Sequence, residues 1–201
     1  MWIEPLKDNL INGQGRAEYA SIVYGKSTIG RSGCAAIACY NAMILSGRFM
    51  PFEEVIAYFE GLFKRGLGWL ASGLLGASPL EMRLFLRKYK VPFRTVWSMR
   101  SLRKLLCSES VQQAGDRSER RPGSKPASGV LILTYWNKPV LKYGYHAVAV
   151  DCRCSGDAPA ERQFTVYNRY NNSAGPERVS DIGGLMEGDR RFIRAFSLIE
   201  F

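Results

Sequence analysis

The chain has 201 residues, of which 46% are hydrophobic and 23% are charged, a balance that is typical of a globular domain and argues against a disordered chain. The 28 Lys and Arg residues outnumber the 18 Asp and Glu residues and give a net charge of +10, but no nucleic-acid-binding motif accompanies this charge, so we expect no nucleic-acid partner. No apolar run approaches the roughly 20 residues of a membrane span, and the first residues lack the pattern of a signal peptide, so we expect one cytoplasmic domain over residues 1–201, without a membrane partner.

The first half of the chain predicts helices. Residues 34–45 are apolar on every side, which indicates a helix that is buried on every side. Residues 51–64 carry an amphipathic stripe, and Ser78-Pro79-Leu80-Glu81 combines an N-cap serine, a proline at the first helical position and an acid at N3, so a helix should begin there. A basic helix is expected over residues 98–106, after a short strand.

The second half of the chain predicts strands. The segment 108–128 is rich in Ser, Gly, Pro and charged residues, and we expect it to be a mobile loop. The β-like runs are residues 92–97, 129–136, 145–151, 163–170 and 191–199. Helices followed by strands predict an α+β fold with a largely antiparallel sheet, on which the buried helix packs.

The five cysteines do not suggest a disulfide framework, because their number is odd and they are sparse. Cys152-Arg153-Cys154 is too tight a pair for zinc, and the chain supplies only one histidine as a further ligand. We therefore expect reduced thiols, no metal site and no cofactor.

Three residues form the strongest candidate for chemistry. His146, the only histidine, begins a β-like run, Cys34 follows Gly33 at the start of the buried helix, and Asn168 ends the β-like run 163–168. The chain order Cys, His, Asn is that of papain-like cysteine hydrolases, in which thiol, imidazole and amide meet in space. The helix start and a nearby imidazolium would both lower the pKa of the Cys34 thiol.

The spacing of His146 and Asn168 suits an antiparallel hairpin, in which paired residue numbers have a constant sum. A turn centred near Asp157 predicts a sum of 314, which is 146 + 168, and so places the two residues opposite each other. We expect the Asn168 side-chain amide to hold one imidazole nitrogen and leave the other facing Cys34. Asp151 should project from the other face and take no part.

Two blocks carry a family resemblance. Ser32-Gly33-Cys34-Ala35-Ala36-Ile37-Ala38 and Tyr145-His146-Ala147-Val148-Ala149-Val150 resemble the signature blocks of the bacteriocin-processing (double-glycine leader) peptidases, a family of the papain-like superfamily, and their stand-alone relatives. The resemblance implies a papain-like fold, with Cys34 as nucleophile, His146 as general base and then acid, and Asn168 as the residue that orients the imidazole. It also implies hydrolysis of a peptide or isopeptide amide.

The chain departs from the family pattern at two places. Ala35 stands where the family commonly has glycine, and no glutamine lies between Gly15 and Cys34 to act as the upstream oxyanion donor, since Gln14 is twenty residues away. Three hypotheses therefore stay open: a peptidase or amidase, an acyltransferase on the same fold, and a catalytically silent peptide-binding domain. The positive net charge leaves an acidic substrate open.

Overall fold

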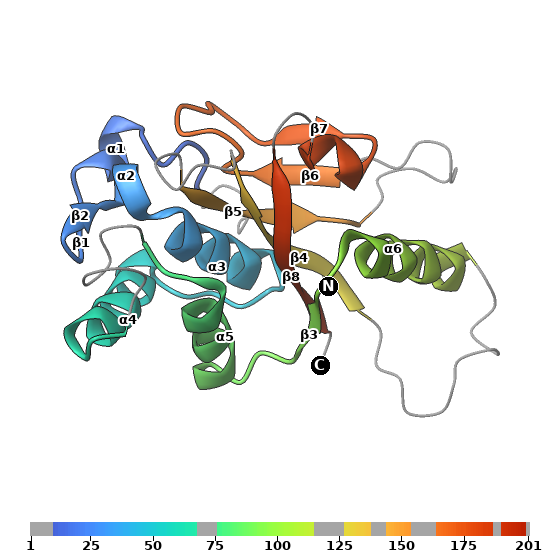
Figure 1. Ribbon diagram of the computed structural model, residues 1–201, viewed down its shortest axis with the longest axis horizontal. Coiled ribbons are helices and arrows are strands. Elements are labelled where there is room, and N and C mark those ends of the chain that lie inside the picture. The colour runs from blue at the N-terminus through green and yellow to red at the C-terminus, as the bar shows by residue number, and fades with distance from the viewer. Residues whose placement is uncertain are drawn as a thin grey trace.

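An antiparallel sheet of six strands forms the centre of the computed structural model, which describes residues 10–67, 76–114, 127–137, 144–153, 164–186 and 190–199 (Figure 1). The strands run in the order β3-β8-β4-β5-β6-β7, and every neighbouring pair is antiparallel. Their bounds are β3 Phe93–Val96, β4 Ala127–Trp136, β5 Tyr145–Asp151, β6 Phe164–Tyr167, β7 Glu177–Val179 and β8 Arg191–Ile199. The predicted α+β fold with an antiparallel sheet is confirmed.

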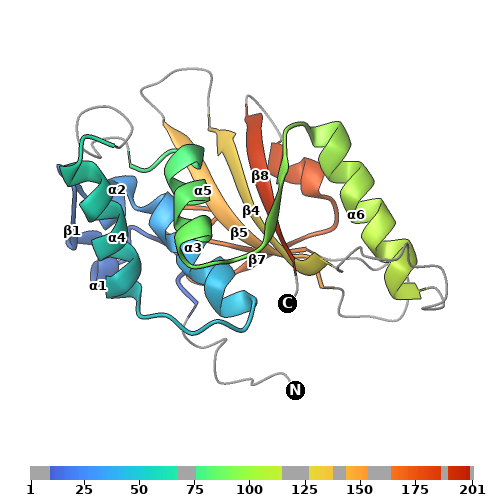
Figure 2. The same ribbon diagram turned by 90° about the horizontal axis from the view of Figure 1, so that it is seen from below.

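Helices cover both faces of this sheet (Figure 2). On one face lie α3, α4 and α5, and on the other lie α6 and the 3-10 helix η5. The bounds are α1 Ala17–Ala20, α2 Ile29–Ser32, α3 Cys34–Leu45, α4 Phe52–Lys64, α5 Pro79–Lys88, α6 Met99–Ala114 and η5 Ile182–Met186, with a small hairpin of β1 Val23–Tyr24 and β2 Ser27–Thr28. Within the described residues, no helix is both long and apolar enough to cross a membrane.

The central helix α3 is buried along its whole length, as its apolar sequence predicts. It packs on β5, where Ala147 and Ala149 present small side chains to it and allow a close approach. Its one clearly polar residue, Asn41, is fully buried and accepts from the Ile11 N–H at 2.9 Å while donating to the Ile11 carbonyl at 2.8 Å. A buried amide must find such partners, and this one ties the N-terminal segment to α3.

The predicted start of α5 is also confirmed. Ser78 caps the helix and its hydroxyl accepts from the Leu80 N–H, while the Glu81 carboxylate accepts from the Ser78 N–H at 2.5 Å. This reciprocal capping satisfies backbone donors that the first helical turn leaves unpaired.

The predicted loop over residues 108–128 is wrong at both of its ends. Helix α6 continues to Ala114 instead of ending at residue 106, and β4 begins at Ala127. No glycine or proline interrupts the chain between Ser98 and Gly115, so the helix meets no strong breaker before that glycine. Residues 115–126, the middle of the predicted loop, lie outside the described residues.

Candidate active site

Cys34 is the first residue of α3, and its thiol lies against β5. The side chain is 5% exposed, and the thiol donates to the Tyr145 carbonyl, with Sγ 3.9 Å from the oxygen. Burial raises the pKa of the thiol to about 11, although the backbone N–H groups of Ala147, Ala35 and Cys34 itself favour the thiolate. The loss of hydration therefore outweighs the effect of the N–H groups at the helix start, and the pKa of the Cys34 thiol is raised instead of lowered as expected.

The thiol lies in the plane of the sheet, at an edge of β5 that β6 leaves open. Along a strand, the C=O of one residue and the N–H two residues later point to the same edge. The sulfur contacts the Tyr145 C=O and the Ala147 N–H, so it lies at the edge of β5 to which both groups point. Strand β4 pairs with the other edge of β5, and β6 pairs with β5 only from Ala149 onward. The sulfur thus occupies the place beyond the end of β6, next to the backbone of His146.

His146 is also 5% exposed, and its ring is held on one side by Asn168. Its Nε2 lies 2.7 Å from the Asn168 backbone oxygen, and its ring meets Tyr135 edge to face at 5.8 Å between centroids. Because a carbonyl only accepts, Nε2 carries the proton and Nδ1 carries the free lone pair. Burial lowers the pKa of His146 to about 4, and the positive charge of Arg190 acts in the same direction, against the opposing carbonyls of Asn168 and Arg169.

The Cys34 and His146 pair is therefore neutral in this structure. With pKa values of about 11 for the thiol and about 4 for the imidazole, moving the proton from sulfur to nitrogen costs on the order of 10 kcal/mol at these values. An ion pair at about 4 Å returns only about 4 kcal/mol at an effective dielectric constant of about 20. No hydrogen bond joins the thiol to the imidazole within the described part of the chain.

The predicted role of the Asn168 amide is wrong, because the backbone carbonyl of this residue holds the imidazole instead. The side chain is turned away and binds Gln14, with Oδ1 accepting from the Gln14 N–H at 2.9 Å and Nδ2 donating to Gln14 Oε1 at 3.2 Å. Asn168 has a φ of 62°, in the left-handed region that asparagine tolerates better than most residues. This turn ends β6 and directs the carbonyl at His146.

The predicted register is also wrong, by two residues. Val150 pairs with Val166, so paired numbers have the sum 316, and the predicted sum of 314 does not occur. A shift of two keeps every side chain on its face, since side chains alternate with a period of two. Val148, Val150 and Val166 accordingly lie together in the cluster on the α6 side, as the pattern predicts.

Gln14 belongs to the neighbourhood of the site although it lies twenty residues before Cys34. It is 3% exposed, binds Asn168 as described, and its Nε2 donates to the Gly30 carbonyl of α2 at 3.4 Å. The signal for it in the sequence is slight: the turn-forming Asn12-Gly13 immediately precedes it. Asp151 behaves as expected of a strand-end group and pairs with Arg153 at 2.7 Å.

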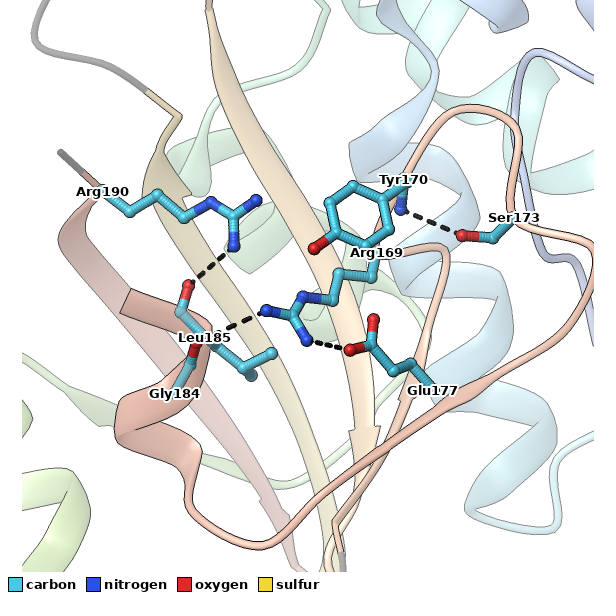
Figure 3. A network of polar contacts seen from close by, with 7 residues as sticks. All are labelled: Arg169, Tyr170, Ser173, Glu177, Gly184, Leu185 and Arg190. Carbon is cyan, nitrogen blue, oxygen red and sulfur yellow. Dashed lines mark hydrogen bonds and ion pairs between the residues drawn. The ribbon is translucent and has the colours of Figure 1, made fainter. Parts of the chain in front are cut away.

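Two arginines pack against η5 (Figure 3), and the positive charge of one of them, Arg190, acts on His146. Arg169 pairs with Glu177 and donates to the Gly184 carbonyl at 3.4 Å, while Arg190 donates to the Leu185 carbonyl at 3.4 Å. Both guanidinium groups thus bind carbonyls of η5. The Arg190 guanidinium also lies 5.6 Å from the ring centroid of Tyr170 and 5.7 Å from that of Tyr135, the cross-strand partner of His146.

A cavity of about 270 Å³ lies elsewhere, between the β1–β2 hairpin and α4, and is lined by Gly25, Lys26, Glu60, Phe63 and Lys64. None of the three candidate residues lines it. Among the described residues, no group of three or more His, Cys, Asp or Glu side chains is placed to hold a metal ion. Comparisons with protein families, with curated proteins and with solved structures find no match for the chain.

Proposed function

We propose that the protein is a papain-like thiol hydrolase that cleaves a peptide or isopeptide amide. The observation that carries the proposal is that the Cys34 thiol meets the backbone of β5 on either side of His146, at Tyr145 and Ala147, although Cys34 and His146 are 112 positions apart in the sequence. The imidazole is oriented from its far nitrogen by residue 168, the third member in chain order. A sulfur at the start of a buried helix, beside the strand that carries an oriented imidazole, supports a proposal of acyl transfer through cysteine.

The chemistry follows from the tautomer. His146 Nδ1 takes the thiol proton as Sγ of Cys34 attacks the carbonyl carbon of the substrate, and the electron pair of the C=O bond moves to oxygen. The N–H of Cys34 is available as one donor to this oxyanion. Collapse of the intermediate expels the amine, which receives the proton from the imidazolium and leaves a thioester. Water, deprotonated by the same imidazole, then releases the acid and regenerates the thiol.

The neutral state of Cys34 and His146 determines the order of the proposed steps. Cys34 and His146 are each 5% exposed, so a substrate must displace the residues that cover the sulfur before it can reach it. The proton then moves together with the attack and not beforehand, because a stable thiolate is too costly in the dry site. The free protein should consequently be a slow nucleophile.

Two alternatives rest on specific observations. A catalytically silent peptide-binding domain is favoured by the raised pKa of Cys34, since an inert buried thiol has this property. An acyltransferase would use the same acyl-enzyme, with an amine in place of water, and an acidic substrate, which the net charge leaves open, would suit the excess of basic residues in either case.

The test is to trap the thioester. The protein is incubated with a library of peptide and isopeptide amides, quenched in acid and weighed intact, with the acyl group mapped to a cysteine. The proposal expects an adduct on Cys34 that disappears in Cys34→Ala and persists in Cys39→Ala, a matched change of a fully buried cysteine on the same helix. Release that depends on added amine identifies transfer. Binding without any adduct would leave the silent domain as the function.

A further inference from the structure

We propose that residues 11–14 form a positioning strap, which holds Asn168 in the conformation that presents its carbonyl to His146. This inference rests on the proposed function, because the orientation of His146 matters only if the imidazole acts. It assigns roles to Asn12 and Gln14. Both residues lie far in sequence from Cys34 and from His146, so no motif spacing points to them.

The first step is that every polar group of Asn168 is used. Its N–H donates to Asn12 Oδ1 at 3.2 Å, and its amide binds the N–H and the Oε1 of Gln14 at 2.9 and 3.2 Å. Its carbonyl is then the one group left for His146 Nε2, at 2.7 Å. Three of these four contacts come from the strap, and Asn168 is fully buried, so water cannot replace them.

The second step is that Asn168 needs to be held. Its φ of 62° lies in a region that asparagine visits but does not prefer, and the end of β6 at Tyr167 leaves it without ladder hydrogen bonds. Without the strap, the chain after Tyr167 could relax to negative φ, which would turn the carbonyl away from the imidazole. The strap therefore selects one of two accessible backbone conformations.

The third step is that the strap connects the elements that carry the site. The side-chain amide of Asn41 in α3 binds both the N–H and the C=O of Ile11, and Gln14 donates to the Gly30 carbonyl of α2. At its other end the Gly15 N–H donates to the Asn171 carbonyl at 2.7 Å. The strap thus fixes the turn after β6 relative to the helix that begins with Cys34.

Gln14 acts through Asn168 and not on the substrate. Its Oε1 is occupied by Asn168, and its Nε2 donates to the Gly30 carbonyl. Asn12 likewise uses its Oδ1 to hold the Asn168 N–H. Both are positioning residues, and their effect should reach the reaction by way of the His146 ring.

The single histidine makes a direct test possible, because any imidazole N–H resonance in the spectrum belongs to His146. Nuclear magnetic resonance of the histidine-labelled protein measures the exchange rate of the Nε2 proton with water. We expect a protected proton in the unaltered protein and exchange faster by roughly tenfold or more in Asn12→Ala and Gln14→Met, which remove the side-chain contacts of the strap without changing charge. Asn12→Asp, which keeps the acceptor oxygen, should restore much of the protection.

The matched control is Asn172→Ala, a change of an exposed asparagine in the neighbouring turn, which should leave the proton protected. Equal protection in Asn12→Ala, Gln14→Met and the unaltered protein would overturn the inference. If those two variants do not fold, Asn168→Gly replaces them, because glycine keeps access to positive φ and loses both amide contacts with Gln14. Full protection in Asn168→Gly would overturn the role assigned to Gln14, because this variant keeps only the contact of the residue 168 N–H with Asn12.

Activity separates the two proposals. If Cys34 forms a thioester with substrate, the strap variants should lower kcat with little change in KM, and Asn12→Asp should recover part of the loss. If no thioester forms in any variant while the exchange rates change as expected, the proposed function fails and the strap stands.

Discussion

The His146 imidazole is held by the backbone carbonyl of Asn168, with Nε2 2.7 Å from the oxygen. The identity of residue 168 therefore matters through its backbone conformation and through the contacts that stabilise that conformation, and not through an amide directed at the ring. This relationship changes what substitutions at position 168 should do.

We expect Asn168→Ala to lower turnover more than Asn168→Gly does, and to be less stable than Asn168→Gly by about 1 kcal/mol. The reason is the φ of 62°, which glycine adopts freely and a residue with a Cβ does not. Urea denaturation and turnover of the two variants measure this. The Cys34 thiol should remain open to slow alkylation in both. Equal loss in both variants would mean that the side-chain amide, not the backbone angle, carries the effect.

The stability of the protein should depend on pH through His146. Its pKa of about 4 in the folded chain lies below the ordinary 6.5, so the unfolded chain binds the proton first as the pH falls. The contribution of about 3 kcal/mol is complete above pH 6.5 and is lost between about pH 6.5 and 4. Denaturation at pH 7.0, 5.5 and 4.5 measures it, and His146→Gln should flatten the dependence in this window. A curve that is the same with and without the histidine would contradict the buried, neutral imidazole.

Arg190→Gln should raise the pKa of His146, because the Arg190 guanidinium disfavours a second positive charge on the imidazole. The matched control is Arg191→Gln, an equal change of charge at the exposed neighbouring position. A titration of the single histidine by nuclear magnetic resonance compares the three proteins. Equal shifts in the two variants would assign the effect to net charge and not to the place of Arg190 over Tyr135.

Iodoacetamide should label Cys34 slowly in the absence of substrate. A thiol with a pKa of about 11 is thiolate in about one molecule in a thousand at pH 8, and the side chain is 5% exposed. Peptide mapping after timed alkylation should find the more exposed Cys152 labelled before Cys34, with the Cys34 rate still rising above pH 9. Rapid labelling of Cys34 at pH 6 to 7 that is lost in His146→Ala would show instead that a thiolate–imidazolium pair exists in the free protein.

Local pattern was sufficient for several of the longer elements. An unbroken apolar run predicts the buried helix α3, the Ser78 and Glu81 spacing predicts the start of α5, and alternation predicts β4 and β5 and the faces that their side chains share. These features depend on residues within a few positions of one another, so the sequence states them directly. The pattern also named the candidate residues, because a single histidine leaves one choice of base for the proposed reaction.

Other features were decided by contacts between distant residues. The register of β5 and β6 differs by two residues from the one that the turn centre predicts. A shift of the pairing by two residues keeps each side chain on its face, so the apolar pattern fits both registers and the turn residues do not choose between them. The partnership of Gln14 with Asn168 spans 154 positions and follows no spacing rule. The helix start predicts a lowered thiol pKa, but burial by the assembled sheet and helices raises it.

The amino-acid sequence by itself thus determined where several of the longer helices and strands lie, which faces are apolar, and which thiol and imidazole are available. The tertiary structure alone decided that a backbone carbonyl orients His146, that an N-terminal segment holds that carbonyl, and that the thiol and imidazole rest neutral. The physical reason is that secondary structure follows short-range periodicity, whereas hydrogen-bond partners and hydration belong to whatever the fold brings together.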